Sequence, residues 1–130
     1  MKRVLILTDL TPASREACGE AMDSLRGDAV HTSLGFIHPS VPQARGLLIR
    51  VEQVHWDTTL GLQAALGAQE SVVCGWAEMQ QRIRSKQFDL VVLTAGAPQA
   101  ADGGQAIPEH FIQSWGVPVV TFPSSAAQSA

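Results

Sequence analysis

Five short apolar runs, separated by longer segments, constrain the fold more than any other feature of this sequence. They cover residues 4–8, 30–37, 71–74, 90–95 and 117–122. Runs of this length with few polar residues are typical of strands that are covered on both faces of a parallel sheet. Because helix signals fill the gaps between them, the sequence predicts an α/β fold with right-handed crossovers.

The first helix signal is the clearest. Thr11 suits an N-cap and Pro12 suits the first helical position, and apolar residues then recur at helical spacing as far as Leu25. Gly27 is placed to end this helix. A second helix is predicted over residues 45–67, where Gly61 is expected to bend or end it because glycine costs about 1 kcal/mol relative to alanine in a helix.

Two further helices are predicted nearer the end of the chain. One is marked by Trp76, Met79 and Ile83 at helical spacing. It has Arg82, Arg84 and Lys86 in its last turn, where cations suit the helix dipole. The other covers residues 107–115 and begins at Pro108. In the strand that follows, Pro118 cannot donate to a ladder, which predicts an edge position for that strand.

Composition excludes several classes of protein. The chain has 130 residues, enough for one domain, and its 45% hydrophobic and 16% charged residues indicate a globular protein. A net charge of −3 offers no basic surface for nucleic acid. No apolar run approaches the roughly 20 residues that span a bilayer. Asp9 ends the first apolar run too early for a signal peptide, so we expect a cytoplasmic protein with no membrane partner.

No catalytic or metal-binding motif is present. The four histidines, His31, His38, His55 and His110, show no helical pairing suited to a metal. Cys18 and Cys74 are too few for a disulfide framework and are expected to be buried free thiols. With no nucleophile elbow and no Walker A sequence, we predict no catalytic residues, no metal and no enzymatic activity.

The order of these elements resembles the universal stress protein family over residues 1–123. The motifs that resemble the family are Lys2-Arg-Val-Leu-Ile-Leu-Thr-Asp9, Thr11-Pro-Ala-Ser14, Phe36-Ile-His-Pro39, Phe88-Asp-Leu-Val-Val-Leu93 and Gly116-Val-Pro-Val-Val120. The resemblance implies one domain with an open five-stranded parallel sheet of order 3-2-1-4-5 and helices on both faces. Residues 124–130 are expected to be a flexible tail.

The resemblance also implies ATP or AMP as the candidate ligand, bound at the carboxyl edge of the sheet. It places Asp9 near the base and a glycine-rich loop around the phosphates. The candidate nucleotide-binding residues are therefore Thr8, Asp9, Phe36, Gly96, Ala97, Gly103 and Gly104.

This sequence departs from the family pattern in the phosphate loop. Thr94 and Ala97 stand where the family has glycines, Gly96 where it often has arginine, and Ile107-Pro108 where it has Gly-Ser/Thr. Proline has no N–H to donate to a phosphate, and isoleucine resists a positive φ. No Lys or Arg follows Lys86 to compensate. We therefore predict that the chain does not bind ATP in the family manner, and no cofactor is assigned with certainty.

The last strand predicts a partner. Val117, Val119, Val120 and Phe122 form an apolar edge without a protecting lysine. The simplest partner is a second copy through a two-fold axis, which the resemblance also implies. Trp76 and Trp115 fit helix core faces, whereas Trp56 is expected to be partly exposed at an interface or pocket.

Two functions stay open. One is a homodimeric, universal-stress-protein-like regulatory protein that acts on protein clients without relying on ATP. The alternative is an adenine-nucleotide-binding stress-response module that uses Asp9 and the loop over residues 96–108, with slow hydrolysis at most. A related nucleotide hydrolase or a phosphorylated receiver domain is disfavoured, because the sequence lacks the glycines and the clustered carboxylates that these would need.

Overall fold

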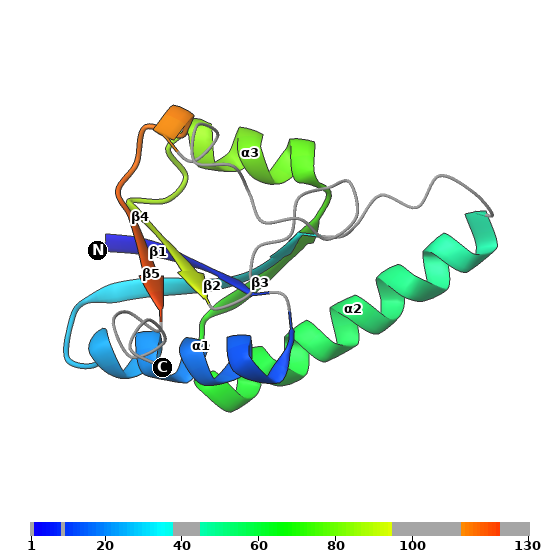
Figure 1. Ribbon diagram of the computed structural model, residues 1–130, viewed down its shortest axis with the longest axis horizontal. Helices are drawn as coiled ribbons and strands as arrows, with labels where there is room; N and C mark the ends of the chain where they lie inside the picture. Colours follow the sequence, from blue (N-terminus) through cyan, green and yellow to red (C-terminus); the bar gives the residue numbers. More distant parts are fainter. Residues whose placement is uncertain (1, 9, 38–44, 95–112, 123–130) are drawn as a thin grey trace.

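The computed structural model describes residues 2–8, 10–37, 45–94 and 113–122. Strands and helices alternate along this part of the chain (Figure 1). The strands are β1 (Lys2–Thr8), β2 (Val30–Ile37), β3 (Glu70–Cys74), β4 (Leu90–Thr94) and β5 (Val119–Phe122). The helices are α1 (Pro12–Ser24), α2 (Arg45–Leu66) and α3 (Trp76–Arg84).

The five strands form one parallel sheet in the order β3-β2-β1-β4-β5, as predicted. Figure 1 shows α1 and α2 on one face of this sheet and α3 on the other. The chain runs from β1 outward through β2 to β3, then crosses to β4 on the other side of β1. The chain therefore leaves β1 toward β2 and leaves β4 toward β5, in opposite directions along the sheet. In such sheets ligands bind in a cleft between the carboxyl ends of these two strands, and we expect the cleft there.

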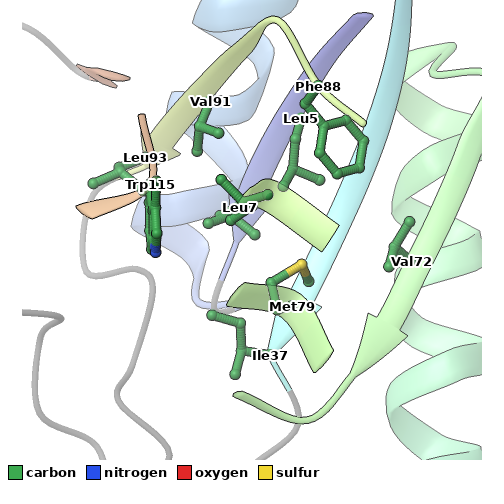
Figure 2. Close-up of a cluster of buried hydrophobic side chains, with 10 residues drawn as sticks. Leu5, Leu7, Ile37, Val72, Met79, Phe88, Val91, Leu93 and Trp115 are labelled. Carbon is green, nitrogen blue, oxygen red and sulfur yellow. The ribbon is translucent and has the colours of Figure 1, made fainter. Parts of the chain in front are cut away.

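Two apolar layers cover the sheet. On the α3 face, alternate residues of β1 and β4 pack with Met79, Phe88 and Trp115 (Figure 2). On the opposite face, Val4, Ile6 and Val92 pack with Cys18 and Ala21 of α1. The central strand β1 is fully buried from residue 4 to residue 8, which explains why its sequence is apolar throughout rather than alternating.

Gly35 is a point of close contact in β2. A Cβ atom added there would lie 2.9 Å from Leu5 Cδ1, 3.0 Å from Leu7 Cδ2 and 3.2 Å from Met79 Cε. The side chains above this face fill the space that a larger residue would need. Glycine normally weakens a strand because of its conformational freedom, but at this position only glycine leaves room for the packed side chains.

Several helix ends agree with their sequence signals. Thr11 caps α1 with its side-chain oxygen, which accepts a hydrogen bond from Ser14 N (3.2 Å). Gly67 has a φ of +77° just after α2, as expected for a helix stop. Gly27 has a φ of +92°, but α1 already ends at Ser24, earlier than predicted.

Two predictions about elements were wrong. Helix α2 continues through Gly61 without ending there, because Thr59 before it is buried and Leu62 after it packs against the core. Strand β5 begins at Val119, so Val117 lies outside it. Pro118 sits just before β5 and accepts a hydrogen bond from Val91 N through its carbonyl (3.0 Å), which places β5 in register on β4.

The edge position of β5 is confirmed by the strand order. The predicted tail over residues 124–130, and most of the predicted helix over residues 107–115, lie outside the described residues. Trp115 is buried and Trp56 is partly exposed, both as predicted; the side chain of Trp76 is not among those described.

Candidate functional site

Three hydroxyl side chains meet at the carboxyl ends of β1 and β4. Thr8 ends β1, Thr94 ends β4, and Ser14 lies in the first turn of α1. All three are at most 1% exposed. Thr8 follows Val4 and Ile6 on the α1 face of the sheet, and Thr94 follows Val92 on that face, so strand alternation brings both hydroxyls beneath α1.

The hydrogen bonds among these groups have a single consistent direction. Thr94 Oγ1 donates to the carbonyl oxygen of Leu7 (2.9 Å), so its one proton is used. Thr94 must then accept from Ser14 Oγ, and Ser14 in turn accepts from Thr8 Oγ1 (2.7 Å). Thr8 Oγ1 accepts from Leu10 N (3.0 Å). The result is a directed chain from the Leu10 amide to the Leu7 carbonyl.

This hydroxyl chain, defined as Thr8, Ser14 and Thr94, uses every hydroxyl proton that it contains. Its donors are therefore not available to a bound anion at this end of the sheet. The start of α1 also keeps part of its donor capacity for itself, because Pro12 has no N–H and the amide of Ser14 is bonded to Thr11. Both features reduce what the sheet edge offers to a phosphate.

The connection from β1 to α1 has an unusual backbone. Leu10 has a φ of +65°, a conformation that residues other than glycine adopt rarely. The Leu10 amide donates to Thr8 Oγ1, and its carbonyl oxygen accepts from Arg15 Nε (3.2 Å). These two contacts hold the strained residue in place beside the hydroxyl chain.

Phe36 is the other described residue from the predicted nucleotide site. It pairs with Thr8 in the register of β1 and β2 and is buried. Its ring contacts the ring of His55 on α2, with centroids 4.6 Å apart. Phe36 therefore lies next to the hydroxyl chain, but its ring packs against α2. The predicted site residues Asp9, Gly96, Ala97, Gly103 and Gly104 lie outside the described residues.

Sequence reasoning missed the role of Ser14 and Thr94 in this site. The available signal was the parity of the strands, since residues 4, 6 and 8 and residues 92 and 94 share a face. A hydroxyl at the end of each strand, with a third in the first helical turn between them, could have been read as one cluster. The contact between Phe36 and His55 had no comparable signal in the sequence.

Cys74 ends β3 at the same edge of the sheet. Its thiol is half-buried, whereas the thiol of Cys18 is fully buried. Burial raises the pKa of the Cys74 thiol to about 11, and the nearby Glu78 carboxylate adds to the rise while Arg82 opposes it. A thiol with so high a pKa is a poor nucleophile at neutral pH.

A surface hollow of about 270 Å³ lies at the opposite, amino-terminal edge of the sheet. Its charged side chains are engaged within the protein: Arg3 with Asp89, Arg82 with Glu78, and Glu70 with Ser33. The backbone amide of Arg3 donates to Asp89 (2.8 Å), and this bond lowers the pKa of that carboxyl below its usual value. We assign no ligand to this hollow.

Within residues 2–8, 10–37, 45–94 and 113–122, no three His, Cys, Asp or Glu side chains are grouped so that they could hold a metal ion. None of the helices in those ranges is both long and apolar enough to cross a membrane.

Comparison with known proteins gives matches in structure alone. No protein-family model matches the chain, and no curated protein sequence matches it. A universal stress family protein from Burkholderia pseudomallei superposes with a TM-score of 0.61 and 12% identity, over 95% of this chain and 96% of that one. The universal stress protein from Archaeoglobus fulgidus in complex with dAMP gives 0.62 and 11%, over 93% and 96%.

A further universal stress protein, solved in complex with cAMP, gives a TM-score of 0.55 and 16% identity, covering 92% of this chain and 94% of that chain. In each case nearly the whole of both chains is matched, so the agreement extends to element order and sheet topology. The identities are too low to transfer a ligand or an activity. What the comparisons establish is that this chain has the fold of the universal stress proteins.

Proposed function

We propose that this chain is a universal stress protein in which the nucleotide site has been converted into a structural element, and that it acts as a homodimeric regulatory protein on protein clients. Its fold matches that family along nearly its whole length. The observation that most directly supports the loss of nucleotide binding is the hydroxyl chain. Thr94 stands where the family resemblance places a glycine of the phosphate loop.

A glycine at the end of β4 leaves room beside β1 and lets the backbone approach a phosphate closely. Thr94 instead places a buried side chain in that position and bonds to both Ser14 and Leu7. Its proton is committed to the Leu7 carbonyl, so it offers no donor to a phosphate oxygen. These hydrogen bonds at the carboxyl ends of β1 and β4 support the proposed loss of phosphate binding.

The proposal assigns no reaction to the chain. Ser14 is fully buried, and its proton is donated to Thr94, so this oxygen is not presented to a substrate. Cys74 keeps its proton at neutral pH because its pKa is raised to about 11. The nucleophilic side chains described at this edge are therefore held in unreactive states.

A second candidate is favoured by the ligands named for two structural neighbours. Universal stress proteins with this fold have been solved with dAMP and with cAMP. In that case Asp9, together with Gly96, Ala97, Gly103 and Gly104, would form a shifted ATP or AMP site. This version makes the chain an adenine-nucleotide-binding module, with Thr8 and Phe36 at its rim.

Isothermal titration with ATP and AMP in the presence of Mg²⁺ separates the two. We expect no micromolar binding by the native chain. Binding at micromolar affinity that is weakened by Asp9→Ala and by Gly104→Val would overturn the first proposal and support the second. Thr94→Gly is the informative gain-of-function variant, because it removes the buried side chain without touching Asp9 or the glycines.

The homodimer is proposed to form through β5. This strand is at the sheet edge, Val120 is 40% exposed, and Val119 packs against the core. A strand edge with an exposed apolar side chain and no lysine is suited to pairing with a second copy. Val120→Lys is expected to convert the dimer into monomers in sedimentation velocity, whereas Ala29→Lys, at an exposed position before β2 on the other side of β1, is expected to leave it dimeric.

A further inference from the structure

Two cationic side chains at the end of α3 bond to the segment that leads into β5. Lys86 Nζ donates a hydrogen bond to the carbonyl oxygen of Gly116. Arg84 Nη2 donates to Ser114 Oγ (2.9 Å). Figure 1 shows this segment, in orange, beside the end of α3. The end of α3 is therefore joined to residues that follow it by 30 positions in the chain.

Lys86 has a backbone conformation that usually selects glycine. Its φ is +65°, and it directly follows Ser85, the C-cap of α3. The residue after a helix cap is commonly a glycine, because a left-handed φ is costly for residues that have a Cβ. After α2 the left-handed residue is Gly67, with a φ of +77°. Lysine bears a strain here that glycine would avoid, and strain of this kind points to a role for the side chain.

The main chain of Lys86 is held on both sides. Its N–H donates to the carbonyl oxygen of Ile83 (3.1 Å). Its own carbonyl oxygen accepts from Nη2 of Arg3 on β1 (2.7 Å). The amide of Arg3 is in turn bonded to Asp89, which directly precedes β4 (2.8 Å). The side chain of Lys86 therefore extends toward Gly116 from a base that is fixed to the central strands.

Gly116 accommodates this ammonium because it has no side chain. Its φ is +70°, and an added Cβ would lie 2.7 Å from Lys86 Nζ. A larger residue would push the ammonium away from the carbonyl oxygen. On either side of Gly116, Trp115 is buried and Val117 packs against the same core cluster. The contact with Lys86 thus lies between two residues that anchor this segment to the body of the protein.

Strand β5 has few hydrogen bonds of its own. It contains four residues, and β4 is its one neighbour among the described strands. A short strand at the edge of a sheet opens at a lower free energy than a central strand, because fewer contacts must break. The position of β5 on β4 therefore depends strongly on the anchors that precede it in the chain.

We propose that the charge of Lys86 controls the opening of β5, and we call its contact with Gly116 the β5 latch. Loss of this charge, by substitution or by acylation of the amine, releases the segment before β5. The strand then opens while the rest of the sheet stays folded. The consequence for assembly rests on the proposed pairing through β5, since an open strand no longer presents the dimer edge. The latch itself is a property of the single chain.

Hydrogen exchange measured by mass spectrometry tests the latch. Lys86→Met keeps an unbranched side chain at the strained position but removes the ammonium. We expect residues 119–122 to exchange about three- to tenfold faster than in the native chain, as for the loss of one hydrogen bond, with unchanged rates in β1 and β2. Lys86→Arg keeps a cation and should restore most of the protection. Lys2→Met is the matched control, an exposed lysine on β1, which β4 separates from β5.

The native ammonium can also be removed chemically, because the chain contains two lysines, Lys2 and Lys86. In the Lys2→Met chain, the N-hydroxysuccinimide ester of acetic acid acylates Lys86 and the terminal amine. Each amine nitrogen forms an amide and loses a proton, and N-hydroxysuccinimide leaves. We expect exchange in β5 to rise as it does in Lys86→Met. A chain with both Lys2→Met and Lys86→Arg, in which the terminal amine alone reacts, should keep its native rate.

The outcomes separate the latch from the dimer. Native exchange of residues 119–122 in both Lys86→Met and the acetylated chain would rule the latch out. Uniformly faster exchange in β1, β2 and β5 would do the same, because it indicates a global loss of stability. The rise must also occur when Lys86→Met is combined with Val120→Lys, since a rise confined to chains that dimerise would contradict a single-chain latch. If β5 opens as expected but the native chain is monomeric in sedimentation velocity, the latch is supported and the β5 pairing fails.

Discussion

The hydroxyl of Thr94 on β4 donates to the main-chain carbonyl of Leu7 on β1 across a distance of 2.9 Å. This bond joins the two strands at their carboxyl ends, where the chain turns from β1 toward β2 and from β4 toward β5. Related folds bind ligands at this position. It also fixes the proton positions of Ser14 and Thr8, because each hydroxyl has one proton to give. The bond therefore ties the two strands together and commits the hydroxyl proton of Thr94.

Thr94→Val keeps the shape of the side chain but removes the hydroxyl. The variant loses the buried hydrogen bonds that join Thr94 to Ser14 and to the Leu7 carbonyl, which is expected to cost about 1–3 kcal/mol in the free energy of unfolding. Urea unfolding measures the loss. Thr121→Val, on the exposed face of β5, is the matched control and should change stability by less than about 0.5 kcal/mol. Equal effects at the two positions would refute the hydroxyl chain.

Two glycine-to-alanine substitutions should change stability in opposite directions. At Gly35 a Cβ would lie 2.9 Å from Leu5 Cδ1, so Gly35→Ala should destabilise by about 1–3 kcal/mol through overpacking. At Gly61 no heavy atom lies within 4 Å of the added Cβ, and the residue is in the middle of α2. Gly61→Ala should therefore stabilise by about 1 kcal/mol. Thermal melting of both variants checks the sign, and a stabilising Gly35→Ala would contradict the packing described.

The alkylation rate of Cys74 should follow its raised pKa. Iodoacetamide reacts with the thiolate, so modification should be slow at pH 8 and should rise as the pH approaches the pKa of about 11. Glu78→Gln removes a nearby negative charge and should increase the rate at pH 8, while Arg82→Gln should decrease it. The unfolded chain in urea provides the reference rate. A native thiol as reactive as this reference would show that Cys74 is not desolvated.

Asp89 should make the fold sensitive to acid. Hydrogen bonding to the Arg3 amide lowers the pKa of this carboxyl in the folded state. Its contribution is therefore complete above the unfolded pKa and is lost as the pH falls through the lower, folded value. In Asp89→Asn the difference in melting temperature between pH 7 and acidic pH should be smaller than in the native chain. Asp23→Asn, on a helix surface, is the control in which that difference should persist.

The architecture could be predicted from local patterns because each strand and helix is marked by its own residues. The bounds of β2 follow from an apolar run between a turn and His38-Pro39, and the start of α1 follows from Thr11 and Pro12. Errors arose where tertiary contacts override a local preference. Gly61 does not end α2, because the residues around it gain packing against the sheet that exceeds the cost of a glycine.

The site was predictable only in its location. Strand order places Thr8 and Phe36 at the carboxyl edge, as expected. The bond from Ser14 to Thr94 joins residues 80 positions apart, and no local pattern indicates a contact of that kind. The assignment of Asp9 and of the glycines to a nucleotide site stays a prediction for the titration to test.

The burial of Trp115 gives the protein an internal optical reporter. The chain has no tyrosine, so its ultraviolet emission comes essentially from three tryptophans. Trp115 is 1% exposed and lies directly before the turn that leads into β5, while Trp56 is open to solvent on α2. A red shift that survives replacement of both Trp56 and Trp76 by phenylalanine would report the release of the last strand from the sheet, in real time and without a label.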